Sequence, residues 1–296
     1  MSQGRESGGT EVPEQEVRKR VPLGVEGLDN NINGGAPAGS LVLVAGEAGA
    51  GAREVLYTSA LMNALGRTNT DLFDLYYGSL ASGASLPEEV HFLSFTEGKG
   101  SIREEMLYTM DRSIVESGVA AIEFGDLSRE YFQLSPVPRE WYAGERAAIT
   151  EMGSSDERRG VIEGLADYLD ANAAGNIVYV DSLTDLVGVR EEETFEWHDI
   201  VYLLQGMRRA IQNWQGVVLV HVSTEVLTDR RLGELMTAVD GTMQFQWASG
   251  GNERSRTMVV REFRGVLSEL EADDIVRFET EIHEGGFDIS NVRKIR

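Results

Sequence analysis

Cysteine is absent from the 296 residues, and this absence excludes disulfide bonds, thiolate metal sites and cysteine nucleophiles. Lysine is nearly absent, since only Lys19, Lys99 and Lys294 occur. No apolar run approaches the ~20 residues that cross a bilayer. The stretch from Met1 to Val17 also lacks the apolar segment of a secretory signal. Together these absences predict a cytoplasmic protein with no membrane association.

Positive charge is scarce as well. Lysine and arginine total 27 against 49 aspartates and glutamates, which gives a formal net charge of −22 at pH 7. This balance disfavours nucleic-acid binding, because neutralising phosphates needs clustered cations. In molar salt, where the Debye length is about 3 Å, such a surface stays hydrated without unfolding the chain. The composition therefore indicates a halophile's protein, with an acidic, arginine-biased mesophilic protein as the alternative.

The order of apolar and polar segments predicts one α/β domain. We expect a disordered tail over residues 1–20 and a single domain over 21–296, with insertions near 66–87 and 128–153. Expected strands cover residues 41–45, 90–95, 119–124, 176–181 and 216–223, and expected helices cover 54–65, 101–116, 156–172, 194–214 and 229–239. Short strands over 242–247, 257–263, 275–281 and 286–289 follow, with a hairpin turn at 249–252. This order predicts a mainly parallel sheet flanked by helices, with a C-terminal antiparallel extension.

A glycine-rich segment between the first core strand and its helix has the spacing of a phosphate-binding loop. Such a loop needs a glycine, four variable residues, a second glycine, a lysine and then a serine or threonine. Gly46 and Gly51 keep the spacing, but Ala52 stands at the lysine position and Arg53 at the hydroxyl position. The candidate nucleotide-binding residues of the loop are Gly46, Glu47, Ala48, Gly49, Ala50, Gly51, Ala52 and Arg53.

The segments around this loop resemble the KaiC and RadA branch of the RecA-like P-loop ATPases. Residues 21–29 and 34–40 are similar to the entry segment of that branch, and Val178 to Thr184 resembles its Walker B strand. The pair Arg264-Gly265 and the strands after it resemble the closing hairpins, so that the resemblance extends over roughly residues 21–290. It implies a RecA-like fold.

The resemblance also implies roles for four residues outside the loop. Asp181 would hold Mg²⁺ through water, Glu97 would be the base that polarises the attacking water, and Thr224 would lie near the γ-phosphate. Arg264 would reach the nucleotide of an adjacent subunit. This sequence departs from the family pattern at positions around the expected phosphate. Ala52 and Arg53 replace the loop lysine and hydroxyl, Thr96 replaces a carboxylate, and Glu262 replaces a lysine.

These departures predict a non-catalytic module, a pseudo-ATPase used in regulation, signalling or assembly. Its cofactor would be ATP or ADP with Mg²⁺, or none, and its partner would be a second copy or a KaiC-like paralogue. The alternative is a slow ATPase in which Arg53 or Lys99 supplies the missing cation. A recombinase-like DNA-binding protein is a third reading, which the net charge disfavours.

Overall fold

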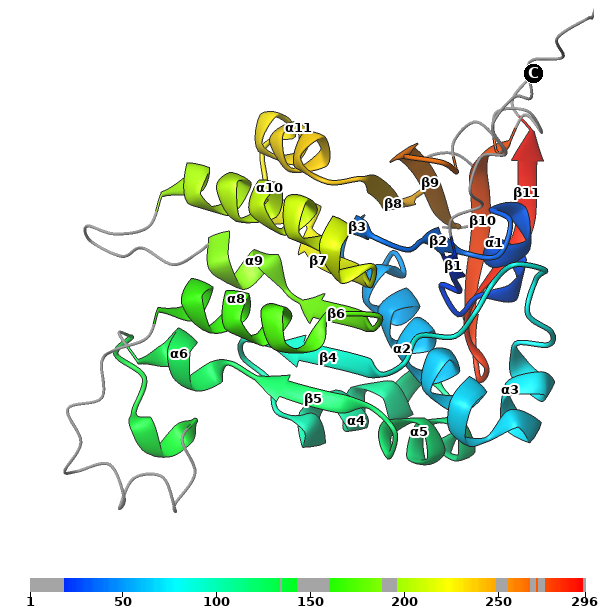
Figure 1. Ribbon diagram of the computed structural model, residues 1–296, viewed down its shortest axis with the longest axis horizontal. Coiled ribbons are helices and arrows are strands. Elements are labelled where there is room, and N and C mark those ends of the chain that lie inside the picture. The colour runs from blue at the N-terminus through cyan, green and yellow to red at the C-terminus, as the bar shows by residue number, and fades with distance from the viewer. Residues whose placement is uncertain are drawn as a thin grey trace, which may run out of the picture.

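The computed structural model describes residues 19–133, 135–142, 160–187, 196–248, 255–266, 270 and 275–294. Within these residues one nine-stranded sheet has the order β11-β10-β9-β8-β3-β7-β6-β4-β5 (Figure 1). Its strands are β3 (Ser40–Gly46), β4 (Val90–Ser94), β5 (Glu123–Asp126), β6 (Ile177–Asp181), β7 (Val217–Ser223), β8 (Gly241–Trp247), β9 (Arg256–Phe263), β10 (Ile275–His283) and β11 (Gly286–Lys294). Neighbouring strands from β8 to β5 are parallel, and those from β8 to β11 are antiparallel. The predicted fold class is therefore confirmed.

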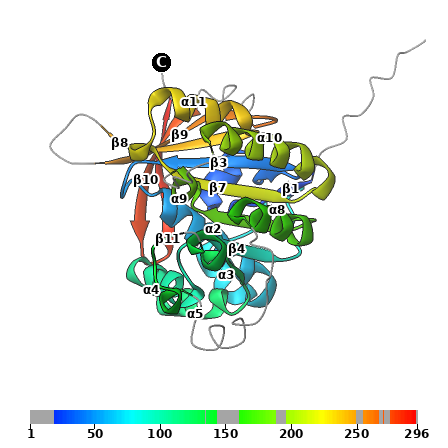
Figure 2. The same cartoon turned by 90° about the vertical axis from the view of Figure 1, so that its left-hand side faces the viewer.

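Helices cover both faces of the sheet (Figures 1 and 2). One face packs on α2 (Ala52–Thr68), α4 (Lys99–Thr109) and α5 (Arg112–Val119), and the other on α8 (Val161–Asn172), α9 (Leu183–Val187), α10 (Trp197–Trp214) and α11 (Asp229–Ala238). Successive side chains of β3 point to opposite faces, so Val42 joins the α2 side while Leu41 and Leu43 join the α10 side. Burial on both faces explains why this strand is a continuous apolar run.

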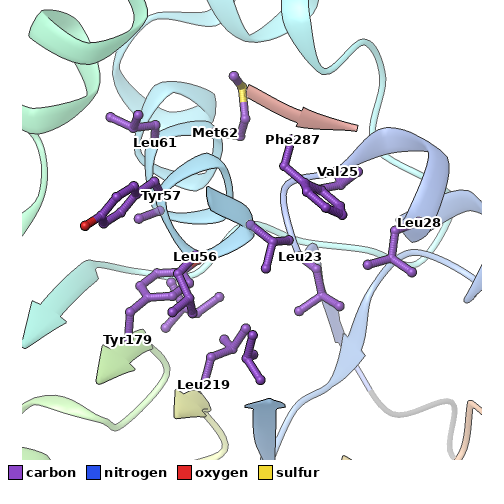
Figure 3. Packing of buried hydrophobic residues seen from close by; sticks show 14 of the residues in the cluster. Leu23, Val25, Leu28, Leu56, Tyr57, Leu61, Met62, Tyr179, Leu219 and Phe287 are labelled. Atoms are coloured by element: carbon purple, nitrogen blue, oxygen red, sulfur yellow. The ribbon is translucent and has the colours of Figure 1, made fainter. Parts of the chain in front are cut away.

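The entry segment closes one end of the α2 face. It contains the short strands β1 (Arg20–Val21) and β2 (Ala36–Pro37) and the helix α1 (Glu26–Asn31). Figure 3 shows Leu23, Val25 and Leu28 packed beside Leu56 of α2 and Phe287 of β11. Arg20, which the sequence assigned to the tail, belongs to β1, and its guanidinium donates to the Gly265 carbonyl at 2.7 Å.

A buried carboxylate of α1 holds the residues before this helix in place. Asp29 is fully buried and accepts hydrogen bonds from the backbone of Leu23 at 2.7 Å and of Gly24 at 3.0 Å. The Tyr77 hydroxyl, just after α3 (Thr70–Tyr76), donates to it at 3.0 Å. Burial raises the pKa of Asp29 to about 7, although these hydrogen bonds oppose the shift.

Two expected elements were wrong. The helix expected over 101–116 is two helices, because the Asp111 side chain caps a new one at the Ser113 amide, at 2.7 Å. The strand expected over 119–124 begins only at Glu123, since Val119 still belongs to α5. The other expected strands and helices are present with shifted ends. The second expected insertion contains α6 (Ser128–Phe132) and η1 (Arg139–Trp141).

Several expectations fall outside the described residues. They are the tail over 1–18, residues 134 and 143–153 of the second expected insertion, the ends of two helices at 156–159 and 194–195, and the turn at 249–252. Among the helices that the structure does describe, none has the length and apolar character needed to cross a membrane.

Candidate functional site

The candidate site lies where the parallel strands end. In the register of the sheet, Gly46 at the end of β3 pairs with Ser223 of β7, and Ser94 of β4 pairs with Asp181 of β6. Since these strands run the same way, the phosphate loop, Asp181 and the segment after β7 share one edge of the sheet. Ligands of open α/β sheets bind at such an edge.

The loop backbone has the shape that phosphate binding needs. Gly49 and Gly51 have φ angles of 70° and 110°, in the left-handed region that favours glycine. A Cβ on Gly46 would lie 2.4 Å from the Ala52 Cβ, so only glycine permits this approach of strand end and helix start. The loop then leads into α2 at Ala52, and the backbone amides of the first turn form the positive end of the helix dipole.

The loop side chains carry no positive charge before Arg53. Ala52, at the lysine position, is 4% exposed and packs in the core, and Ala50 is fully buried. Glu47 brings a negative charge, and its carboxylate accepts the Trp247 backbone N–H at 3.1 Å. In this loop, therefore, no side chain before Arg53 supplies a cation.

Side chains from two neighbouring segments hold the loop in place. The Trp247 indole N–H donates to the Ala48 carbonyl at 3.0 Å, and Arg256 Nε donates to the Gly49 carbonyl at 2.9 Å. The Arg256 guanidinium also stacks on the Trp247 ring, 4.8 Å from its centre. From η2 (Thr224–Val226), the Glu225 carboxylate accepts the Ala48 N–H at 3.3 Å. A carboxylate thus occupies a loop amide that could contact an anionic ligand.

The Arg53 side chain lies among a group of carboxylates. Its Nε lies 3.0 Å from Asp181 Oδ2, and its Nη1 lies 3.2 Å from Glu105 Oε2 and 3.9 Å from Glu97 Oε1. The Arg53 side chain is 39% exposed, whereas the Asp181 side chain is only 5% exposed. The predicted site residues Arg53, Asp181 and Glu97 therefore lie together, with Glu105 as a fourth member.

Neighbouring donors fix these carboxylates. His221 Nδ1 lies 2.8 Å from Asp181 Oδ1, the Tyr57 hydroxyl donates to Glu105 Oε2 at 2.5 Å, and the Ser101 hydroxyl donates to Glu97 at 3.3 Å. Each acidic side chain thus contacts the guanidinium and is also held from a second direction.

The pKa shifts follow from these contacts. Burial raises the pKa of Asp181, but the hydrogen bonds and charges of His221 and Arg53 outweigh it, so the pKa falls below its ordinary value. For Glu97, burial and the adjacent Glu105 raise the pKa, and Arg53 opposes them only in part. Asp181 is therefore held as a carboxylate, whereas Glu97 takes up a proton more readily than an exposed glutamate does.

Two other predicted residues lie apart from this group. Thr224 begins η2 at the end of β7, and the described contacts of its side chain include neither Arg53 nor Asp181. Arg264 follows β9 beside the start of β8, which is the opposite end of β8 from Trp247 and the phosphate loop. It is 71% exposed and pairs with Asp240 at 3.4 Å. Its own loop is therefore out of its reach.

Residues of the site that the sequence analysis missed include Tyr57, Glu105, Glu225, Trp247 and Arg256. Tyr57 was predictable, because it lies four residues after Arg53 on the expected helix. Trp247 and Arg256 flank the expected hairpin turn, and they form a cross-strand pair. Glu105 gave no signal, since its position depends on how α4 packs beside α2.

A RecA-like fold implies a nucleotide with Mg²⁺, and the residues fit only part of that ligand. The glycines allow the loop to bend as a phosphate site does, although the amides of Glu47, Ala48 and Ala50 already donate hydrogen bonds within the protein. The metal does not fit, because the Arg53 guanidinium lies against the carboxylate that would hold it. In the described part of the chain, no group of three or more histidines, aspartates or glutamates is arranged to hold a metal ion.

Comparison with known proteins supports the fold. No protein-family model matches the sequence, and no curated protein sequence matches it. The structure is similar to the crystal structure of a KaiC-like protein from the hyperthermophilic archaeon Pyrococcus horikoshii, with a TM-score of 0.59 over 93% of this chain and 100% of that chain. The two sequences are 17% identical, so the similarity establishes the fold alone. The chain has the RecA-like fold of that KaiC-like protein.

Proposed function

We propose that this chain is a non-catalytic KaiC-like module, which acts in regulation or assembly through its RecA-like fold. The ion pair between Arg53 and Asp181 carries the proposal. In the ATPases that this chain resembles, the aspartate at this position helps to hold the metal that bridges the β and γ oxygens. Here one oxygen of Asp181 contacts Arg53 and the other contacts His221. The carboxylate is thus used within the protein.

The loss of the lysine supports the same conclusion. A lysine in the loop neutralises charge that develops in the transition state, and losing one such contact typically costs about 10²–10³ in rate. Ala52 is buried at that position and supplies no charge. Arg53 follows on the helix, about 100° further round, and its side chain leads to Glu105 and Asp181.

Nucleotide binding without hydrolysis is compatible with the loop. Free amides and the dipole of α2 favour an anion at its N-terminus. The carboxylates of Glu47 and Glu225 oppose that attraction, because both contact the loop or the strand beside it. We therefore propose weak binding of ATP or ADP, through the backbone and without turnover.

The partner we propose is a second copy of the chain or a KaiC-like paralogue. Arg264 is exposed at the edge of the sheet opposite its own loop, so any nucleotide it contacts belongs to a neighbouring subunit. A net charge of −22 disfavours DNA as the partner.

A slow ATPase is the second candidate, and the raised pKa of Glu97 favours it. That activity would require Arg53 to leave its carboxylates and reach the γ-phosphate. Lys99 is the other candidate for the missing cation, and its ammonium lies 5.0 Å from the centre of the Phe124 ring.

Phosphate release from Mg²⁺-ATP in about 1 M KCl, where exposed charges are screened, separates the two candidates. We expect the wild type to release no more phosphate than the Glu97→Gln variant. Wild-type turnover that Glu97→Gln abolishes would establish the slow ATPase and end the proposal.

Sedimentation tests the proposed assembly. We expect the wild type and the control variant Arg261→Ala to form oligomers, and we expect Arg264→Ala to weaken them. An all-monomeric wild type would contradict self-assembly.

A further inference from the structure

The side chains at the position expected for the metal do not fit a divalent cation. Mg²⁺ prefers carboxylate and water oxygens in a compact octahedral arrangement. Asp181, Glu97 and Glu105 converge at the carboxyl edge of the sheet, but they converge on the guanidinium of Arg53. We infer that Arg53 is a covalently attached replacement for the divalent cation, so that this group of carboxylates carries its own positive charge and binds no metal there. This inference rests on the proposed non-catalytic function.

The charges of the group agree with this inference. With Asp181 as a carboxylate, Arg53 supplies the cation that its burial requires, since an unpaired buried charge is strongly unfavourable. A divalent ion could contact Asp181 Oδ2 only if the guanidinium moved, because like charges at such short range repel. Arginine remains protonated at any pH at which the chain folds. The positive charge is therefore permanent.

The carboxylates are arranged as a guanidinium requires. Nε and Nη1 of Arg53 contact different acidic side chains, as a planar fork of donors allows. Tyr57 fixes Glu105, and His221 fixes Asp181. Tyr57 lies one helical turn after Arg53 on α2, so the same helix supplies the cation and one of the groups that position its partners.

The same contacts connect three elements that meet at the phosphate loop. Arg53 lies in the first turn of α2, Asp181 at the end of β6 and Glu105 in α4. In a metal-dependent site, binding of the ion would order such a junction. Here a side chain spans it whether or not an ion is present.

Binding of Mn²⁺ to the nucleotide-free protein tests the inference. The variants are Arg53→Gln, which removes the charge, Arg53→Lys, which keeps it, and Arg53→Gln combined with Asp181→Asn. Arg103→Gln is the matched control, because Arg103 also pairs with two glutamates, Glu104 and Glu116, and neither belongs to the group around Arg53. Electron paramagnetic resonance counts bound Mn²⁺, and about 1 M KCl suppresses weak binding to the acidic surface.

We expect no saturable site in the wild type, Arg53→Lys or Arg103→Gln. We expect one site in Arg53→Gln, with an affinity at least about tenfold above the background, that Asp181→Asn removes. A wild type that binds Mn²⁺ through Asp181, or an Arg53→Gln protein that gains no site, would overturn the inference. If Arg53→Gln does not fold, the melting temperature of the wild type, measured with and without Mn²⁺, tests the inference instead. We expect Mn²⁺ to leave it unchanged, and a rise that Asp181→Asn abolishes would refute the inference. No nucleotide is present, so this result is independent of ATP turnover.

Discussion

Trp247 and Arg256 face each other across the β8–β9 hairpin, and each donates a hydrogen bond to a carbonyl of the phosphate loop. Their stacking, with the guanidinium 4.8 Å from the centre of the indole, keeps both donors directed at the loop. The hairpin thereby supports a loop in which Ala52 stands at the lysine position.

We predict that Trp247→Phe speeds hydrogen exchange of the loop amides over residues 48–51. The change removes the indole N–H that Ala48 accepts while keeping an aromatic ring. Loss of one such hydrogen bond costs about 1 kcal/mol, which corresponds to about fivefold faster exchange if the loop opens locally. Mass spectrometry of exchanged peptides measures it.

Trp197→Phe is the matched control for that experiment. Trp197 also stacks with an arginine, Arg231, at 4.8 Å, and its indole donates to Glu234 at 2.5 Å. It lies on α10, so its replacement should leave the loop unaffected. Equal acceleration by both variants would contradict a specific role for Trp247.

A second prediction concerns the coupling between Arg53 and Asp181. Arg53→Ala leaves Asp181 buried with His221 as its remaining hydrogen-bond partner, and we expect a loss of about 1–3 kcal/mol in the free energy of unfolding. The partial exposure of Arg53 places this below the cost of a fully buried pair. Denaturant unfolding of Arg53→Ala, of Asp181→Asn and of the double variant measures the coupling energy between the two side chains. Strictly additive effects would show that the contact contributes nothing.

The buried Asp29 predicts a pH dependence of stability. Its pKa is about 7 in the folded chain and 3.8 in the unfolded reference, so the folded chain binds more protons between these values. Stability from this group is complete below about pH 4 and is lost as the pH rises through 7. The shift corresponds to at most about 4 kcal/mol.

Asp29→Asn should remove this part of the pH dependence, because the amide stays neutral at every pH. Unfolding free energies at pH 5, 6, 7 and 8 compare the variant with the wild type. The general repulsion within an acidic chain gives a slope of the same sign in both proteins, so only the difference is informative. An unchanged slope in Asp29→Asn would mean that Asp29 is already ionised in the folded chain at low pH.

Glu225 yields a fourth prediction. Its carboxylate accepts the Ala48 N–H, so Glu225→Gln should strengthen binding of metal-free ATP by about two- to fivefold, the effect of one exposed charge near a helix N-terminus. Glu54→Gln removes an equal charge in the first turn of α2 and serves as the control. Isothermal titration measures both. A larger gain in Glu54→Gln would show that the general field, and not the contact with the loop, limits binding.

The sequence predicted the elements that repeat a pattern. The short continuous apolar run of β3 indicates a strand buried on both faces, and Ile200, Leu204 and Ile211 of α10 recur with the period of a helix. Both elements are present. The break before α5 was missed because one capping carboxylate, Asp111, outweighs a continuous helical pattern.

The site divides in the same way. The glycines and the alignment of the loop with Asp181 and Glu97 follow from local spacing and strand order, which a sequence reveals. The direction of the Arg53 side chain depends on Glu105, which is 52 residues away, and on the packing of α4 beside α2. Such a contact is decided by tertiary structure, and the sequence contains no periodic signal for it.

A cation that is part of the polypeptide cannot be chelated. Treatment with EDTA would strip a metal-dependent subunit of its ion while leaving the Arg53 contacts of this chain intact. In an assembly that mixes the two kinds of subunit, this chain would therefore keep its conformation when magnesium runs short, and could act as the fixed reference against which its partners change.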